Sequence, residues 1–243
     1  MAQGYSKKYI KAIGYLVTFT LTAYILGIIY KYSIPNPGLF MRLIMVSSCF
    51  AIIYVIARIF YGNPFGKIEP SASYFEGLIH ILILMLPLYA YSVVAMFIFG
   101  MKRFYIMGKP GFVDVWNPFL PSYALLFWTI CGFMVVYFYH AVSHELFGKS
   151  DRFMGILSAT ILFALNYNQP FLTGFWNIED ILFFGLVFAY SYSVKKNPLA
   201  LLSAYLLSEV PLWWCILGPL GELGFATYLF MRLALSITAL IIV

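Results

Sequence analysis

The sequence predicts an all-α integral membrane protein, a single domain over residues 1–243 with about eight spanning helices. Of its 243 residues, 63% are hydrophobic and only 10% are charged, and the mean hydropathy is +0.90. Soluble domains are usually about half apolar and about a quarter charged, so the composition excludes a water-soluble enzyme and a disordered chain. Because lipid offers the backbone no hydrogen bonds, helices are the expected form of the apolar segments.

Eight apolar segments follow one another along the chain, and a spanning helix needs about 20 residues of this kind. The fifth and sixth segments are short, so three arrangements stay open: little tilt, packing inside the bundle, or an incomplete crossing. Turns rich in proline and glycine separate several segments, as at 33–38 and 62–66. The segments are Ile10–Tyr30, Leu39–Tyr61, Leu78–Phe99, Tyr123–Phe147, Phe153–Tyr167, Ile178–Val194, Leu199–Leu217 and Leu223–Val243.

Basic residues predict the orientation in the membrane. The net charge is +6, but the basic residues lie mainly at the ends of apolar segments, and no basic stripe is long enough to follow a nucleic acid. An inside N-terminus gives a positive-inside excess, which favours a multi-pass protein of the cell membrane with both termini cytoplasmic. The inner loops then hold Lys7, Lys8, Lys11, Arg58, Lys67, Lys149, Arg152, Lys195 and Lys196, and the outer side holds Lys31, Arg42, Lys102, Arg103 and Lys109.

Histidines near the inner end of the fourth segment form the first candidate site. His140 and His144 are four residues apart and share one face of an α-helix, and Glu145 follows directly. His80 lies near the start of the antiparallel third segment, at a similar predicted depth. Three histidines with a carboxylate could hold a divalent metal. The alternative is that these histidines cap helix ends at the interface and that no cofactor is bound.

Two charged residues near the middle of the last segments form the second candidate site. Glu209 lies about halfway along the seventh segment, and Arg232 lies ten residues into the eighth. A charge inside an apolar segment is costly unless it is paired or hydrated. We therefore expect a buried Glu209–Arg232 ion pair, with either a structural or a functional role.

Three short motifs follow in order between about Tyr139 and Pro211, under a third of the chain. They are His144-Glu145-Leu146-Phe147-Gly148-Lys149, Phe163-Ala164-Leu165-Asn166-Tyr167 and Tyr205-Leu206-Leu207-Ser208-Glu209. They resemble the EExxxR, FxxxH and HxxxN motifs of the CPBP family of intramembrane proteases, which includes CAAX prenyl proteases. The resemblance implies a bundle of about eight membrane helices in which glutamates and histidines activate a water.

The catalytic positions of that family are largely substituted here. The first glutamate is His144, the arginine is Lys149, and both histidines are tyrosines, at Tyr167 and Tyr205, so only Glu145 remains. Tyrosine, with a pKa of about 10, is neither a base at neutral pH nor a common zinc ligand. Glu145 and His144 are thus the candidate catalytic residues, in a scaffold that the resemblance implies has lost proteolysis.

Four functions stay open, the last of them a secondary transporter with helices interrupted at Pro87, Pro211 and Gly218-Pro219, and the sequence does not decide whether the protein is an enzyme. The first is a catalytically degenerate relative that binds a hydrophobic partner or peptide beside the membrane lipids. The second is a structural or accessory subunit of a larger membrane complex, packed against other transmembrane subunits. The third is an active metal-dependent endopeptidase, with Glu145 as base and His80, His140 and His144 as metal ligands.

Overall fold

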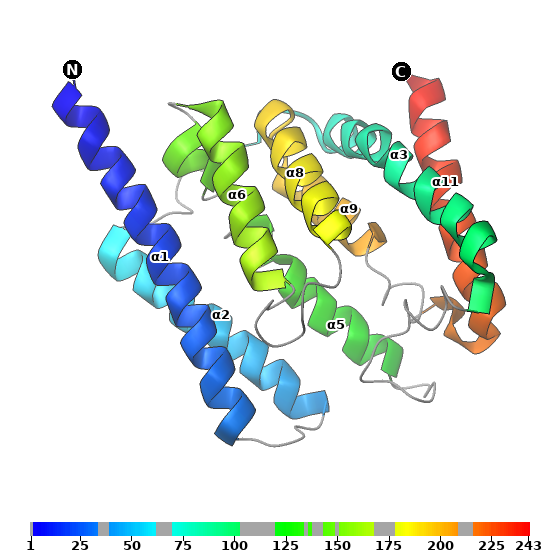
Figure 1. Cartoon of the computed structure of the whole chain (residues 1–243), viewed down its shortest axis with the longest axis horizontal. Coiled ribbons are helices and arrows are strands. Elements are labelled where there is room, and N and C mark those ends of the chain that lie inside the picture. The colour runs from blue at the N-terminus through cyan, green and yellow to red at the C-terminus, as the bar shows by residue number, and fades with distance from the viewer. Residues whose placement is uncertain are drawn as a thin grey trace. The chain divides into compact units, whose positions relative to one another are not determined.

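Every element that the structure describes is a helix. The computed structural model describes residues 2–33, 39–61, 70–102, 120–133, 136–137, 143–148, 151–167, 178–208 and 216–243, and these ranges contain no strand (Figure 1). The predicted all-α class is therefore confirmed. The elements are α1 (Ala2–Ser33), α2 (Leu39–Tyr61), α3 (Tyr74–Phe99), α5 (Leu120–Phe133), the π-helical turn η2 (His144–Gly148), α6 (Arg152–Tyr167), α8 (Ile178–Val194), α9 (Pro198–Ser208), the 3₁₀ turn η3 (Gly218–Leu220) and α11 (Gly221–Ile242).

Described helices lie in all eight apolar segments of the sequence, although the described residues cover the fourth and seventh segments only in part. The fourth segment holds α5, described to Phe133, and the π-helical turn η2. The seventh holds α9, which ends at Ser208. Residues 209–215 lie outside the described residues, and the chain is helical again at 216–217.

Two helices in the described part of the chain are long and apolar enough to cross a membrane, judged by length and composition. They are Tyr74–Phe99 and Gly218–Ile242. The other apolar stretches found there, which lie within α1, α2, α6, α8 and α9, are shorter, between 10 and 17 residues. Eight crossings are therefore not confirmed, and the number of spans stays a prediction.

The chain divides into two compact units, and the predicted single domain stays untested. Unit 1 comprises Met1–Ser71 and Phe133–Pro198, and unit 2 comprises Ala72–Gly132 and Leu199–Val243. The boundary falls inside the fourth predicted segment, so its two halves belong to different units.

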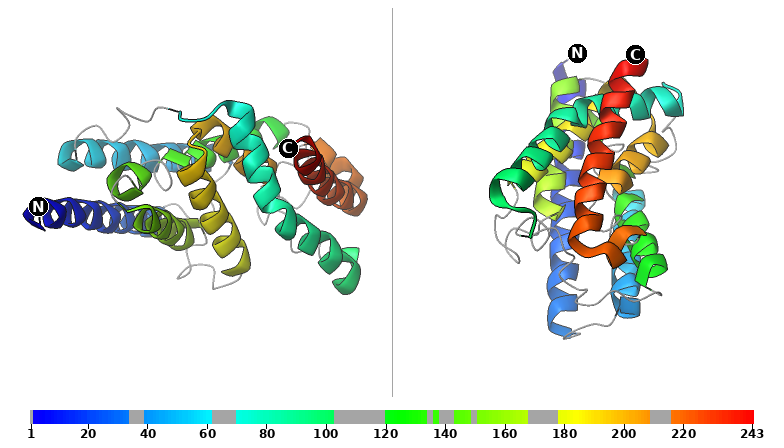
Figure 2. Two further views of the ribbon diagram at one scale, coloured as in Figure 1. Left: turned by 90° about the horizontal axis from the view of Figure 1, so that it is seen from above. Right: turned by 90° about the vertical axis from the view of Figure 1, so that its right-hand side faces the viewer.

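Unit 1 contains two antiparallel helix pairs. Helices α1 and α2 lie side by side, as do α6 and α8, while α1 and α8 also contact η2 (Figures 1 and 2). Helices α6 and α8 approach closely because Gly185 has no side chain, so a Cβ there would lie 3.3 Å from the Cγ2 of Thr160. Phe147, Phe163 and Phe188 fill the interior and are at most 1% exposed.

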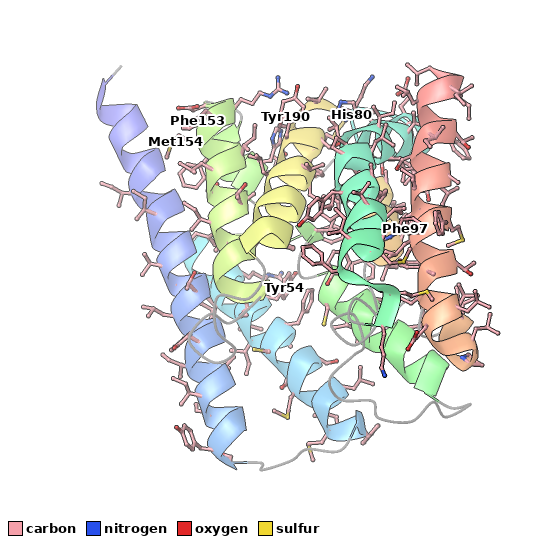
Figure 3. All side chains as sticks on the ribbon, turned by 45° about the vertical axis from the view of Figure 1, so that its right-hand side comes forward. Tyr54, His80, Phe97, Phe153, Met154 and Tyr190 are labelled. Carbon is pink, nitrogen blue, oxygen red and sulfur yellow. The ribbon has the colours of Figure 1, made fainter. Side chains whose placement is uncertain are left out.

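Unit 2 contains α3 and α11, which lie side by side and antiparallel (Figures 1 and 2). A capping box starts α3, because the Ser73 hydroxyl accepts from the Glu76 amide and the Glu76 carboxylate accepts from the Ser73 amide. Near its other end, the ring of Phe97 packs edge-on against Phe230 of α11, with centroids 6.1 Å apart (Figure 3). These contacts hold the two longest apolar helices of unit 2 together.

Candidate functional site

The π-helical turn η2 presents the candidate catalytic residues of unit 1. Such turns have i→i+5 hydrogen bonds and often occur at functional sites. His144 and Glu145 begin the turn, and Phe147 anchors it with a side chain that is 1% exposed. The Asp151 amide, directly before α6, donates to the Phe147 carbonyl at 2.8 Å, so a hydrogen bond ties the start of α6 to η2.

Lys196 approaches Glu145 from the end of α8. Its backbone carbonyl accepts from the Ser71 amide at 2.8 Å. Its Nζ lies 2.5 Å from Glu145 Oε1, and the two side chains are only 13% and 12% exposed. Glu145 therefore forms a mostly buried ion pair that joins η2 to the residues following α8.

The energetic consequence of this ion pair comes from its burial. An exposed ion pair contributes about 0–1 kcal/mol, whereas removing one partner of a buried pair costs about 3–5 kcal/mol, because the other charge is left without compensation. With about an eighth of each side chain exposed, the lower end, about 3 kcal/mol, applies to Glu145 and Lys196. The pair is thus a structural connection of unit 1.

Three more polar side chains belong to these elements. The His144 ring meets the Tyr192 ring edge-on, with centroids 5.6 Å apart and planes at 83°. Ser143 Oγ and the Tyr192 hydroxyl are buried and make no hydrogen bond within the described part of the chain. Buried polar atoms normally have a protein or water partner, so these hydroxyls mark a place for water or a polar group. We call Ser143, His144, Glu145, Tyr192 and Lys196 the Glu145 cluster.

The ion pair restricts what Glu145 can do chemically. A general base must reach the proton that it removes, and a metal ligand must offer an oxygen to the ion. Oε1 of Glu145 already accepts from the Lys196 ammonium. Either role would require the ion pair to open or to be shared with the water or metal.

A second polar arrangement surrounds Arg232 in unit 2. The guanidinium lies between the rings of Tyr89 and Tyr228, 4.8 and 4.9 Å from their centroids. Its Nη1 donates to the Ser208 carbonyl at 2.7 Å, and the Tyr228 hydroxyl donates to the Leu207 carbonyl. The Tyr89 hydroxyl lies 2.5 Å from Ser208 Oγ. We call Tyr89, Ser208, Tyr228 and Arg232 the Arg232 cage.

The Arg232 cage caps the C-terminal end of α9. The last carbonyls of a helix have no partners within the helix, and their partial negative charge favours a cation. Tyr228 and Arg232 are one turn apart on α11 and bind the carbonyls of Leu207 and Ser208. Arg232, which is 5% exposed, therefore has a specific structural task whatever else it binds.

Tyr205 is a packing residue of unit 2. It is 1% exposed on α9, and a Cβ added at Gly132 of α5 would lie 2.9 Å from its Cδ1 and 2.7 Å from Cδ1 of Leu202. The absence of a side chain at Gly132 is therefore what lets α5 approach α9. Tyr205 stands where the HxxxN motif has its histidine, and its ring takes part in this close contact between α5 and α9.

The predicted metal ligands are only partly described. His80 is half-buried on α3 in unit 2 (Figure 3), His144 belongs to unit 1, and His140 lies outside the described residues. No group of three or more histidine, cysteine, aspartate or glutamate residues that could hold a metal occurs in the described ranges. A shared helix face for His140 and His144 requires α-helical spacing, whereas His144 begins a π-helical turn. The metal site stays a prediction.

Several motif positions cannot be placed. Lys149 and Glu209 lie outside the described residues, so the predicted Glu209–Arg232 ion pair stays a prediction. Tyr167 is the last residue of α6, and only its backbone is described. Of the predicted site residues, the structure brings His144 and Glu145 together in the Glu145 cluster, and it places Tyr205 and Arg232 in unit 2.

Sequence reasoning missed the partners of both charged groups. The sequence identifies Lys196 only as a basic residue that indicates membrane orientation. Its predicted position on the same side of the membrane as Glu145 was the available signal for their ion pair. The partners of Arg232 are a backbone carbonyl and two tyrosine rings. Nothing in the sequence distinguishes Tyr89 and Tyr228 from the rest of the 20 tyrosines in the chain.

Comparison with known proteins gives no neighbour for this fold or site. No protein-family model, curated protein or solved structure matches the chain significantly. The resemblance to the CPBP family therefore rests on the three short motifs.

Proposed function

We propose that this chain is a multi-pass integral membrane protein of the CPBP type that has lost proteolysis and acts by binding a hydrophobic partner helix or peptide. The observation that carries the proposal is the Glu145–Lys196 ion pair. Glu145 is the one acidic residue kept from the catalytic motifs, and its Oε1 accepts from the Lys196 ammonium. The motif position Tyr205 is used in helix packing.

Exposed apolar side chains support the membrane location. Besides the two helices long enough to cross, α1 exposes large apolar residues every three or four positions, which is one helix face. Continuous apolar surfaces of this length mark contacts with a membrane or with another protein. With the basic residues on the predicted inner side, this favours eight crossings with both termini cytoplasmic. The exposed residues of α1 include Ile10, Ile13, Val17, Leu21, Ile25 and Ile28.

A cleavage assay tests the loss of proteolysis. Purified full-length protein in liposomes is incubated with prenylated peptides and with transmembrane peptides, and fragments are measured by mass spectrometry. We expect no product above that of Glu145→Ala, which removes the retained carboxylate, and retention of a transmembrane peptide by both proteins. Cleavage by the wild type that is lost in Glu145→Ala would refute the proposal and establish the active endopeptidase.

Metal analysis tests the active endopeptidase independently. An active metal-dependent endopeptidase needs a resident ion near full occupancy. A protein that has lost this chemistry should instead contain less than about a tenth of an equivalent of any transition metal when it is purified without chelators. A stoichiometric metal that is lost in His144→Ala would contradict the proposal. His80→Ala is a second variant for the same measurement, because His80 also belongs to the predicted set of metal ligands.

A structural subunit of a larger complex is the second candidate, and the exposed apolar face of α1 favours it specifically. Other transmembrane helices would cover such a face. Extraction in a mild detergent distinguishes the two candidates. A defined complex that survives purification and dissociates on Val17→Lys and Leu21→Lys supports the subunit, whereas a monomer that still retains transmembrane peptide supports the binding protein.

A further inference from the structure

Helices α6 and α8 of unit 1 carry two exposed apolar stripes. Each stripe has the four-residue spacing of one helix face, and its members are large side chains between 37% and 69% exposed. We call the two stripes together the α6–α8 face, which consists of Phe153, Leu157, Ile161, Leu186, Tyr190 and Val194.

Both stripes lie on the same side of the helix pair. The helices touch where Gly185 meets Thr160, and the next residues, Ile161 and Leu186, each lie about 100° round from that contact, with the other members of each stripe displaced by about 40° per four residues. Because α6 and α8 are antiparallel, successive residues turn in opposite senses seen from one end, which brings the two stripes to one side. Phe153 and Tyr190 lie at the same end of the pair (Figure 3).

A cationic site stands at that end. Nε of Arg152 donates to Ser193 Oγ at 3.0 Å, and its guanidinium lies 5.2 Å above the centroid of the Tyr190 ring. Arginine has five N–H donors in a planar fork that matches phosphate oxygens, so most donors remain for a ligand. Lys195, directly after α8, is half-buried beside this end, and its amide donates to the Ser191 carbonyl at 2.8 Å.

The nearby carboxylates offset these cations only in part, because Asp151 balances one positive charge and Glu145 is balanced by Lys196. Oδ1 of Asp151 accepts from the Met154 amide at 3.2 Å as the N-cap of α6. Glu145 is engaged with Lys196. The end of the α6–α8 face is therefore positively charged, beside a tyrosine of the kind that is enriched at membrane interfaces.

We propose that the α6–α8 face binds one acidic phospholipid, with the phosphate at Arg152 and Lys195 and the acyl chains along the two apolar stripes. This rests on the membrane location in the proposed function. The predicted orientation places Arg152 and Lys195 on the cytoplasmic side, where acidic lipids concentrate and basic sites between helices bind their headgroups. Charge complementarity selects an acidic lipid over a zwitterionic one or an apolar helix.

Native mass spectrometry of the full-length protein tests the lipid site. Delipidated protein in detergent is titrated with phosphatidylglycerol or with phosphatidylcholine of the same acyl chains, and bound lipid is counted. We expect one phosphatidylglycerol to be retained preferentially. Arg152→Gln should weaken its binding about five-fold, and the double variant with Lys195→Gln more, since each cation near a headgroup contributes on this scale.

Arg58→Gln is the matched control, because Arg58 is an exposed arginine on α2, also on the predicted inner side, and this variant should bind like the wild type. Three results would overturn the lipid site: equal retention of both lipids, equal loss in Arg58→Gln and Arg152→Gln, or equal binding of soluble glycerol phosphate. A dimer that dissociates on Leu157→Gln, without lipid preference, would assign the face to a second copy. Recovery of the chain without detergent would instead refute the membrane location.

Discussion

Arg232→Met isolates the cap on α9, because methionine keeps an apolar stem and removes the charge and every donor. The Ser208 carbonyl then loses its 2.7 Å bond from Nη1. Ser208 is 2% exposed, so water does not readily replace the guanidinium. Losing a buried hydrogen bond to a charged group costs about 1.5–3 kcal/mol, and the contacts with two rings add about 1 kcal/mol. Relief from burying a cation offsets part of this, which leaves a net loss of about 2 kcal/mol.

Thermal unfolding of the purified protein in detergent, followed by circular dichroism, measures this loss. At about 2–4 °C per kcal/mol for a chain of this length, Tm should fall by about 4–8 °C. Arg232→Lys keeps the charge and should fall less. Hydrogen exchange should accelerate in the last turn of α9, because its carbonyls lose their cap.

Arg58→Met serves as the matched control for Arg232→Met, since Arg58 is exposed near the end of α2. Its Tm should stay within about 1 °C of the wild type, because exposed charges contribute little. Equal Tm values for the Arg232 and Arg58 variants, or unchanged exchange at the end of α9, would refute the capping role.

Three further predictions concern single positions. Gly132→Ala should lower Tm by a few degrees, because its Cβ would meet a side-chain carbon of α9 at 2.7 Å and overpacking costs about 1–3 kcal/mol. Gly185→Ala, whose Cβ would lie 3.3 Å from Thr160 Cγ2, should lower Tm less in the same assay, because a smaller shift relieves that contact. Asp151→Ala should cost about 1 kcal/mol through loss of the N-cap of α6, and Asp151→Asn should restore most of the Tm. If Glu209 pairs with Arg232, the loss of unfolding free energy in the double variant Glu209→Gln, Arg232→Met should differ from the sum of the two single losses by at least about 1 kcal/mol. Additive losses would contradict that ion pair.

Much of the fold follows from local sequence patterns. Long apolar segments determine where helices form, because every residue of such a segment favours burial or lipid over water. The helix boundaries follow from proline and glycine turns, as at Asn197 and Pro198, where α9 begins. The π-helical turn η2 escaped prediction, because the π and α forms differ by one residue in hydrogen-bond spacing and share the same composition.

The candidate site was less predictable, because side-chain partners come from distant parts of the chain. Glu145 and Lys196 are 51 residues apart, and only their predicted membrane side connected them. The expected partner of Arg232 was a carboxylate, since charge is the visible signal in a sequence. The structure instead gives Arg232 the carbonyl of Ser208 and the rings of Tyr89 and Tyr228, and backbone acceptors leave no mark in the sequence.

Exchanging the charges of Glu145 and Lys196 most directly tests the claim that the Glu145–Lys196 ion pair holds unit 1 together. Glu145→Lys and Lys196→Glu each place like charges together, so each should lower Tm by about 6–12 °C, the equivalent of about 3 kcal/mol. The double variant restores an ion pair in the reverse sense and should recover at least half of either loss. The account would be contradicted by a double variant whose Tm is no higher than that of the less stable single variant. It would also be contradicted by a Lys196→Glu protein with the Tm of the wild type.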